Sequence, residues 1–185
     1  MRGFTIVELL IAIVVIAILA TISILAYNDI QKRAGTAAYT AAVDGIEKQL
    51  RIAATQDIII DQPGSYPYRC IGDVSDFPAE DDFAEGSCAT SVINGVMNPN
   101  HRVVDQAFTD QLKAAGVSMP GRLPTVNYTD SQYGYKYSYR GITAIALKNS
   151  RQFWLNWRTP ERSSCGRGTF NASADVASCT LMIKL

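Results

Sequence analysis

Histidine is almost missing from this chain, and the common motifs of catalysis are missing entirely. His101 is the single histidine among 185 residues, which excludes a metal centre built from several histidines. Catalysis that depends on histidine would rest on this one residue. The sequence also contains no Gly-rich phosphate loop and no nucleophile motif. We therefore expect no enzymatic activity, no metal and no cofactor.

An excess of charge of either sign is also missing. Lysine and arginine together number 17, as do aspartate and glutamate, so the formal net charge is zero. A chain without net charge has no overall field that attracts polyanions. Acidic residues nevertheless gather in one segment, at Asp73, Asp76, Glu80, Asp81, Asp82 and Glu85. Their spacing fits no EF-hand, so we interpret the segment as a solvated loop and not as a calcium site.

Cysteine pairs of the metal-binding kind are missing as well. The four cysteines are Cys70, Cys88, Cys165 and Cys179, and no two of them form a CxxC motif. An even number of cysteines in a chain with the character of an exported protein favours disulfides over zinc. Of the three possible connectivities we prefer Cys70 with Cys88 and Cys165 with Cys179, because each pair closes a short segment. Buried free thiols are the alternative.

A long apolar run, in contrast, opens the chain. From Phe4 to Ala26 the sequence reads FTIVELLIAIVVIAILATISILA, in which Glu8 is the only charged residue. Roughly 20 apolar residues are enough to cross a bilayer as a helix. The run is too long for the apolar core of a cleaved signal peptide, and no small-residue cleavage site follows it. It therefore predicts a membrane helix, whose simplest form is a signal anchor for an exported domain.

Two residues of this segment indicate more than an anchor. An ionisable side chain inside a membrane helix is costly, so Glu8 needs a partner. Only Met1, Arg2 and Gly3 precede the apolar run, and Gly3 lies where the basic start meets it. Together the residues GFTIVELL, from Gly3 onward, resemble the type III signal of type IV pilins and their relatives.

The resemblance implies a processing site and an assembly residue. It implies that prepilin peptidase cleaves between Gly3 and Phe4, removes the leader 1–3, and methylates the new amine of Phe4. It also implies that Glu8 pairs with the N-terminal amine of a neighbouring subunit. Simple electrostatics agrees, because a buried carboxylate and a buried ammonium are tolerable mainly as a pair.

The resemblance further implies a structural role. The chain would be a pilin that waits in the inner (cytoplasmic) membrane and then polymerises as a homo-oligomer into a surface pilus. An assembly platform with its ATPase would drive this step, and the filament would serve adhesion, motility or DNA uptake. A pseudopilin of a type II secretion system and a minor tip pilin share the signal, so both stand as alternatives.

Residues 28–56 continue the helix of residues 4–27 in amphipathic form. No proline interrupts them, and apolar residues recur at helical spacing at Tyr39, Val43, Ile46, Leu50 and Ala53. The whole helix then has roughly 50 residues and a length of about 75–80 Å. Thr21 and Ser23 are expected to bond back to carbonyls within it. A globular head, residues 57–185, should pack on the apolar stripe.

The head is expected to contain one short helix and one sheet. In the connecting region 57–131, residues 99–115 predict a helix that Asn98 caps and Gly116 ends. In residues 132–185, a period-two pattern predicts a strand over 133–139. Further strands are expected at 142–147, 152–157 and 179–185, beside a cysteine-bounded loop. The predicted fold is α+β, with the long helix packed against a C-terminal antiparallel sheet of about four strands. The resemblance to pilins implies the same architecture.

The C-terminal third carries one further alternative. Basic residues outnumber acidic ones there, and aromatic residues such as Tyr135, Tyr137, Tyr139, Trp154 and Trp157 lie among them. Such a pattern can hold nucleic acid through phosphate contacts and base stacking. A signal-anchored DNA-binding domain is therefore the alternative from another class, although alternating tyrosines are more typical of the two faces of a sheet.

Overall fold

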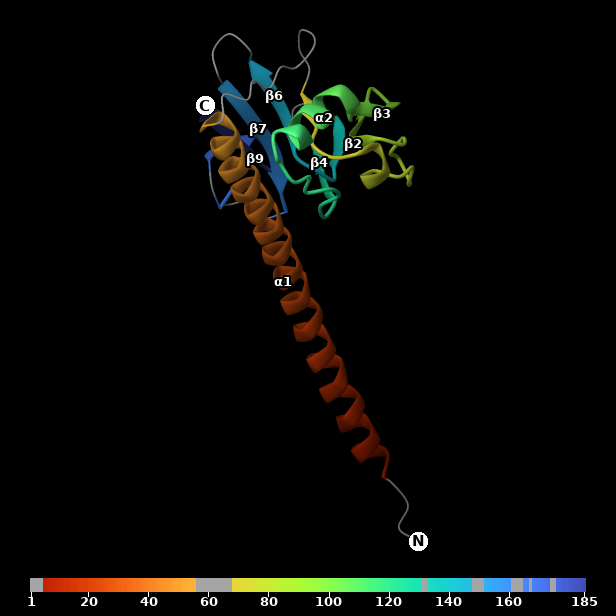
Figure 1. Cartoon of the computed structure of the whole chain (residues 1–185). Coiled ribbons are helices and arrows are strands. Elements are labelled where there is room, and N and C mark those ends of the chain that lie inside the picture. Colours follow the sequence, from red (N-terminus) through yellow and green to blue (C-terminus); the bar gives the residue numbers. More distant parts are fainter. Residues whose placement is uncertain are drawn as a thin grey trace.

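A computed structural model describes residues 5–55, 68–130, 133–147, 152–160, 165–166, 168–173 and 176–185. One long helix, α1 (Ile6–Thr55), carries a globular head on its C-terminal half (Figure 1). The head contains two antiparallel sheets and a second helix. The α+β class and the long N-terminal helix expected from the sequence are therefore confirmed.

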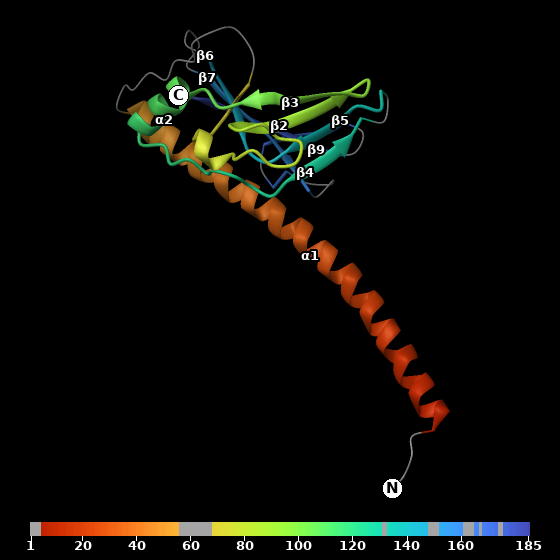
Figure 2. The ribbon, with the colours of Figure 1, turned by 90° about the vertical axis from the view of Figure 1, so that its right-hand side faces the viewer.

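The two halves of α1 have different surroundings. The first half extends away from the head (Figure 2), and its side chains are exposed all the way around the helix. The second half packs on the head through the expected stripe, and its buried residues are Gly35, Thr36, Tyr39, Val43, Ile46, Glu47, Leu50 and Ala53. The Tyr39 hydroxyl donates to the carbonyl of Pro124 at 3.0 Å, and burial raises the pKa of this tyrosine.

A five-stranded sheet covers the apolar stripe of α1. Its strand order is β1 (Arg69–Cys70), β6 (Thr143–Leu147), β7 (Gln152–Thr159), β9 (Val176–Lys184) and β8 (Thr169–Ser173). Burial along β7 alternates strictly, so Phe153, Leu155 and Trp157 face the core while the residues between them face outward. These side chains join Tyr39 and Leu50 of α1 in the main core of the head.

A second, four-stranded sheet lies beside the first and corrects the expectation of a single C-terminal sheet. Its order is β3 (Val96–Val103), β2 (Ser87–Ile93), β5 (Lys136–Tyr139) and β4 (Val126–Thr129). Three of these strands lie in the connecting region. The strands β2 and β3 are joined by Asn94 and Gly95, whose φ angles are 52° and 76°. An Asn-Gly pair with positive φ at both residues is the preferred two-residue hairpin turn.

The short helix begins later than the sequence predicted. Helix α2 spans Gln106–Ala114 and is capped by Asp105, whose side chain accepts from the Phe108 amide at 3.2 Å. Residues 99–103 belong to β3 instead, and Asn98 lies in the same strand. Pro99 is tolerated there because β3 is an edge strand. The predicted end is confirmed, since Gly116 adopts φ 77° just beyond the helix.

Candidate functional site

The exposed half of α1 is the most unusual surface of the molecule. Its large apolar side chains are open to solvent from Ile6 to Ile30, and their exposed fractions reach 84% at Ile6. Among the described residues, α1 is the one helix long and apolar enough to cross a membrane. The apolar stretch 6–26 measures about 31 Å, close to the roughly 30 Å hydrocarbon thickness of a bilayer. This half therefore needs lipid or other apolar helices around it.

Glu8 lies at the free end of this surface and bonds to Thr5. Its Oε2 accepts one hydrogen bond from the Thr5 backbone N–H and one from the Thr5 hydroxyl, both at 2.8 Å. The Glu8 amide donates in turn to the Thr5 hydroxyl at 3.2 Å. This reciprocal pattern is a capping box, which satisfies otherwise unpaired backbone donors in the first turn of the helix.

The capping box places the Glu8 carboxylate at the start of the helix. Our sequence reasoning treated Glu8 as a charge in need of a partner and missed this contact. The spacing Thr-x-x-Glu, from Thr5 to Glu8, is the sequence signal that predicts it. The cleavage and methylation residues, Gly3 and Phe4, lie outside the described residues, so their roles stay predictions.

Further along the exposed half, two hydroxyls bond back to the helix as expected. Thr21 donates to the carbonyl of Ile18 at 2.7 Å, and Ser23 donates to that of Leu19 at 2.8 Å. Both side chains satisfy their polar groups within the helix, so neither presents an unpaired hydroxyl to lipid. The apolar character of this half is therefore maintained between Glu8 and the head.

The cysteines form the two disulfides that the sequence analysis preferred. One joins Cys70 to Cys88, and both cysteines pack against Phe77, a residue within the acidic segment. The other joins Cys165 to Cys179 and lies against α1, where the Thr40 hydroxyl donates to the Cys165 carbonyl at 3.4 Å. The first disulfide joins β1 to β2 within the connecting region, and the second fastens the C-terminal region near α1.

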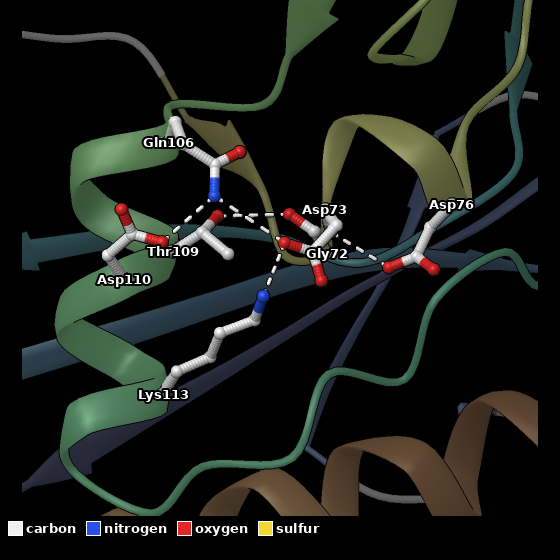
Figure 3. A network of polar contacts seen from close by, with 7 residues as sticks. All are labelled: Gly72, Asp73, Asp76, Gln106, Thr109, Asp110 and Lys113. Carbon is white, nitrogen blue, oxygen red and sulfur yellow. Dashed lines mark hydrogen bonds and ion pairs between the residues drawn. The ribbon is translucent and has the colours of Figure 1, made fainter.

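The acidic segment is tied to α2 and is not simply solvated. Asp73 bonds to Lys113 and to Gln106 of α2, and Asp76 accepts from the Asp73 amide at 2.8 Å (Figure 3). The hydrogen bond from Lys113, more than any other contact, lowers the pKa of Asp73. Among the described residues no three acidic, histidine or cysteine side chains are grouped closely enough to hold a metal.

The aromatic residues proposed as a nucleic-acid surface do not share one face. Trp157 and Tyr139 are buried, with exposed fractions of 1% and 6%. Tyr137 stacks on Tyr128 with ring centroids 4.9 Å apart, and Arg158 lies over the Tyr139 ring at 5.0 Å. Tyr139 and Trp157 are therefore not free to stack on bases, as that alternative requires.

Comparisons with known proteins support the reading of the N-terminus. Residues 1–24 match the family model of the prokaryotic N-terminal methylation motif, which is the signal of type IV pilins and prepilins. No curated protein and no solved structure matches the chain. The motif supports a prepilin-type protein, either pilin-like or pseudopilin, and implies processing by prepilin peptidase and association with the membrane.

Proposed function

We propose that this chain is a structural subunit of a type IV pilus, processed behind Gly3 and polymerised through the first half of α1. One observation carries the proposal. A processing signal opens a helix whose first half is apolar on every side, and a folded head is confined to the other half. Such a molecule can be stored in lipid and later buried among copies of itself.

The driving force for assembly is the apolar surface of α1. In the membrane, lipid covers residues 6–26; outside it, the same surface would face water. Burial against neighbouring helices removes that surface from water, at about 25 cal/mol for each Å². The head does not obstruct this contact, because it covers only the second half of the helix (Figure 2).

Glu8 would set the position of one subunit against the next. Cleavage behind Gly3 creates an ammonium group at Phe4, and this cation is costly to bury alone. Both hydrogen bonds from Thr5 go to Oε2 of Glu8, which leaves Oε1 available for the amine of a neighbour. An ion pair in an apolar filament core stabilises one register of neighbouring subunits. Other registers are destabilised, because a shifted subunit leaves both charges unpaired.

This role is structural and involves no catalysis by the chain. A pseudopilin of a type II secretion system would use the same helix and the same Glu8, and would differ in which machine takes it up. DNA binding by the head has less support, because Trp157 and Tyr139 are buried. Surface display, motility and DNA uptake are roles of the filament as a whole.

Processing is the first step to test. The full chain would be expressed in bacterial membranes with and without a prepilin peptidase, beside a Gly3→Val variant. We expect the peptidase to remove residues 1–3 and add one methyl group at Phe4, and Gly3→Val to retain the leader. An intact leader on the unmodified chain in the presence of an active peptidase, verified on a known prepilin, would contradict the proposal.

A further inference from the structure

A polar groove in the head lies on the outer side of the four-stranded sheet. Its volume is about 590 Å³, which is within the range of small-ligand sites. The floor is one face of three neighbouring strands, formed by Thr90, Val92, Asn127, Thr129, Lys136 and Ser138. The strand register places these residues opposite one another, Thr90 and Asn127 both beside Ser138. The walls are the turn 80–83 and the segment around Arg122.

The floor includes one polar side chain that is almost fully buried. The Thr90 side chain lines the groove although only 3% of the residue is exposed, and no described residue bonds its hydroxyl. A hydroxyl that has no partner within the protein is satisfied by water or by a ligand. The Thr90 hydroxyl is therefore available to a ligand in the groove.

The wall of the groove is held rigidly from behind. The side chain of Arg140 is fully buried, and it donates to the carbonyls of Ser87 at 2.9 Å and Pro78 at 2.7 Å. Its guanidinium lies over the Phe83 ring at 4.2 Å. Mutual backbone bonds between Glu80 and Phe83, at 3.1 and 2.7 Å, close the turn that presents Asp81 and Asp82. A wall fixed in this way loses little entropy when a ligand binds.

The chemistry of the groove excludes several ligand classes. Glu80 lies 2.5 Å from Arg122 and 3.6 Å from the buried Arg140, and Asp81, Asp82 and Lys136 are the other charged residues at the groove. Three acids and three cations therefore balance one another, which favours a ligand without net charge over phosphates and other anions. A metal ion is disfavoured, because the described residues offer no group of three acidic, histidine or cysteine side chains. An added peptide strand would need a free sheet edge, whereas this groove lies over a sheet face.

We propose that the groove binds a short neutral saccharide. Hydroxyl, amide, carboxylate and ammonium groups line it together, which supplies both donors and acceptors to a ligand rich in hydroxyls. Carboxylate oxygens of Asp81 and Asp82 would accept from sugar hydroxyls, the Asn127 amide would donate and accept, and Thr90 would bond at the base. This binding belongs to the head alone and does not depend on filament assembly.

The test uses the full chain in dodecylphosphocholine micelles, because sugar-based detergents would compete for the groove. A glycan array presenting neutral, sialylated and sulfated glycans identifies the ligand class, and NMR titration with the best free saccharide gives its Kd. We expect neutral glycans to bind. We also expect Asp82→Asn and Asn127→Ala each to weaken binding about tenfold or more, through the loss of hydrogen bonds to the sugar.

Glu85→Gln is the matched control, because it removes a charge from the same acidic segment but lies outside the groove. It should leave the Kd unchanged. Thr90→Val keeps the shape and the β-branch of the side chain and should also weaken binding, while the unfolding temperature shows that the head is intact. Binding of sulfated glycans alone, equal binding by the groove variants, or no binding on the array would each overturn the proposal.

Discussion

At the scale of single residues, Glu8 makes one contact within the chain and is proposed to make a second one in the filament. In the isolated chain it completes the capping box with Thr5 and so stabilises the first turn of α1. In the proposed filament it also holds the amine of a neighbouring subunit. The first contact needs only a hydrogen-bond acceptor, whereas the second needs a negative charge. Substitutions that keep one property and remove the other can therefore separate the two contacts.

We expect Glu8→Gln to abolish assembly almost as fully as Glu8→Ala. Glutamine can serve in a capping box but cannot pair as an anion with an ammonium group. Thr5→Ser keeps the hydroxyl of the cap and should assemble normally. The measurement is the amount of the chain in sheared surface filaments, relative to the amount in the membrane. Normal assembly of Glu8→Gln would show that capping, and not charge pairing, explains the need for Glu8.

Two glycines of α1 offer a matched pair of stability tests. A Cβ atom at Gly35 would lie 2.8 Å from Cγ of Pro160, whereas a Cβ at Gly45 meets nothing within 4 Å. Alanine in place of glycine inside a helix stabilises by about 1 kcal/mol. We expect that gain for Gly45→Ala. Gly35→Ala should be less stable than Gly45→Ala by about 1–3 kcal/mol, because the head must move away from the helix.

Thermal unfolding of the full chain in micelles gives both values, with the wild type as reference. The difference in stability between the two variants reports on packing alone, because the two substitutions are chemically identical and lie on the same helix. An equal gain in stability from both would mean that the head does not approach α1 closely at Gly35, and would contradict the packing described here.

At the scale of elements, the sequence predicted best where one pattern repeats over many residues. Helix α1 was predictable because its apolar stripe persists from Tyr39 to Ala53 without a proline. The hairpin of β2 and β3 was missed, although Asn94-Gly95 marks its turn, because the short run SCATSVI does not alternate clearly. The same oversight placed the start of α2 at Pro99, whereas Pro99 occupies an edge strand.

The link between the acidic segment and α2 predicts a dependence of stability on pH. The pKa of Asp73 is lowered in the folded chain, chiefly by its hydrogen bond from Lys113. A lowered folded pKa stabilises the fold above the ordinary Asp pKa, near 4, and this contribution is lost as the pH falls below it. We expect the wild type to lose more stability between pH 5 and pH 3 than Asp73→Asn does.

Unfolding temperatures of both proteins at the two pH values check this expectation. Glu85→Gln is a suitable control, because it removes an exposed acid of the same segment, and it should retain the pH dependence of the wild type. If Asp73→Asn showed the full wild-type dependence, the contact with Lys113 would contribute nothing to the stability of the head.

At the scale of the whole molecule, the pairing of distant segments was beyond sequence reasoning. Strand β1 pairs with β6, so Cys70 lies opposite Thr143 across a long separation in the chain. No local pattern contains that information, since strand order depends on how the whole core closes. The groove over the four-stranded sheet was hidden for the same reason, because its floor and walls come from separate parts of the chain.

The exposed half of α1 is the surface of the whole molecule on which the proposed filament depends most. The two apolar core clusters of the described residues are buried in the head, while Ile6 to Ile30 is covered by nothing in the single chain. The proposed function therefore depends on what surrounds this half in the assembled state. Lipid before assembly and identical helices after it are the two environments that the proposal requires.

A cryo-EM reconstruction of sheared filaments tests this claim most directly. The account predicts first halves of α1 packed together at the filament axis, heads on the outside, and the Glu8 carboxylate within about 4 Å of the Phe4 amine of a neighbouring subunit. Filaments in which these helices stay apart, or in which Glu8 lies away from every N-terminal amine, would contradict it.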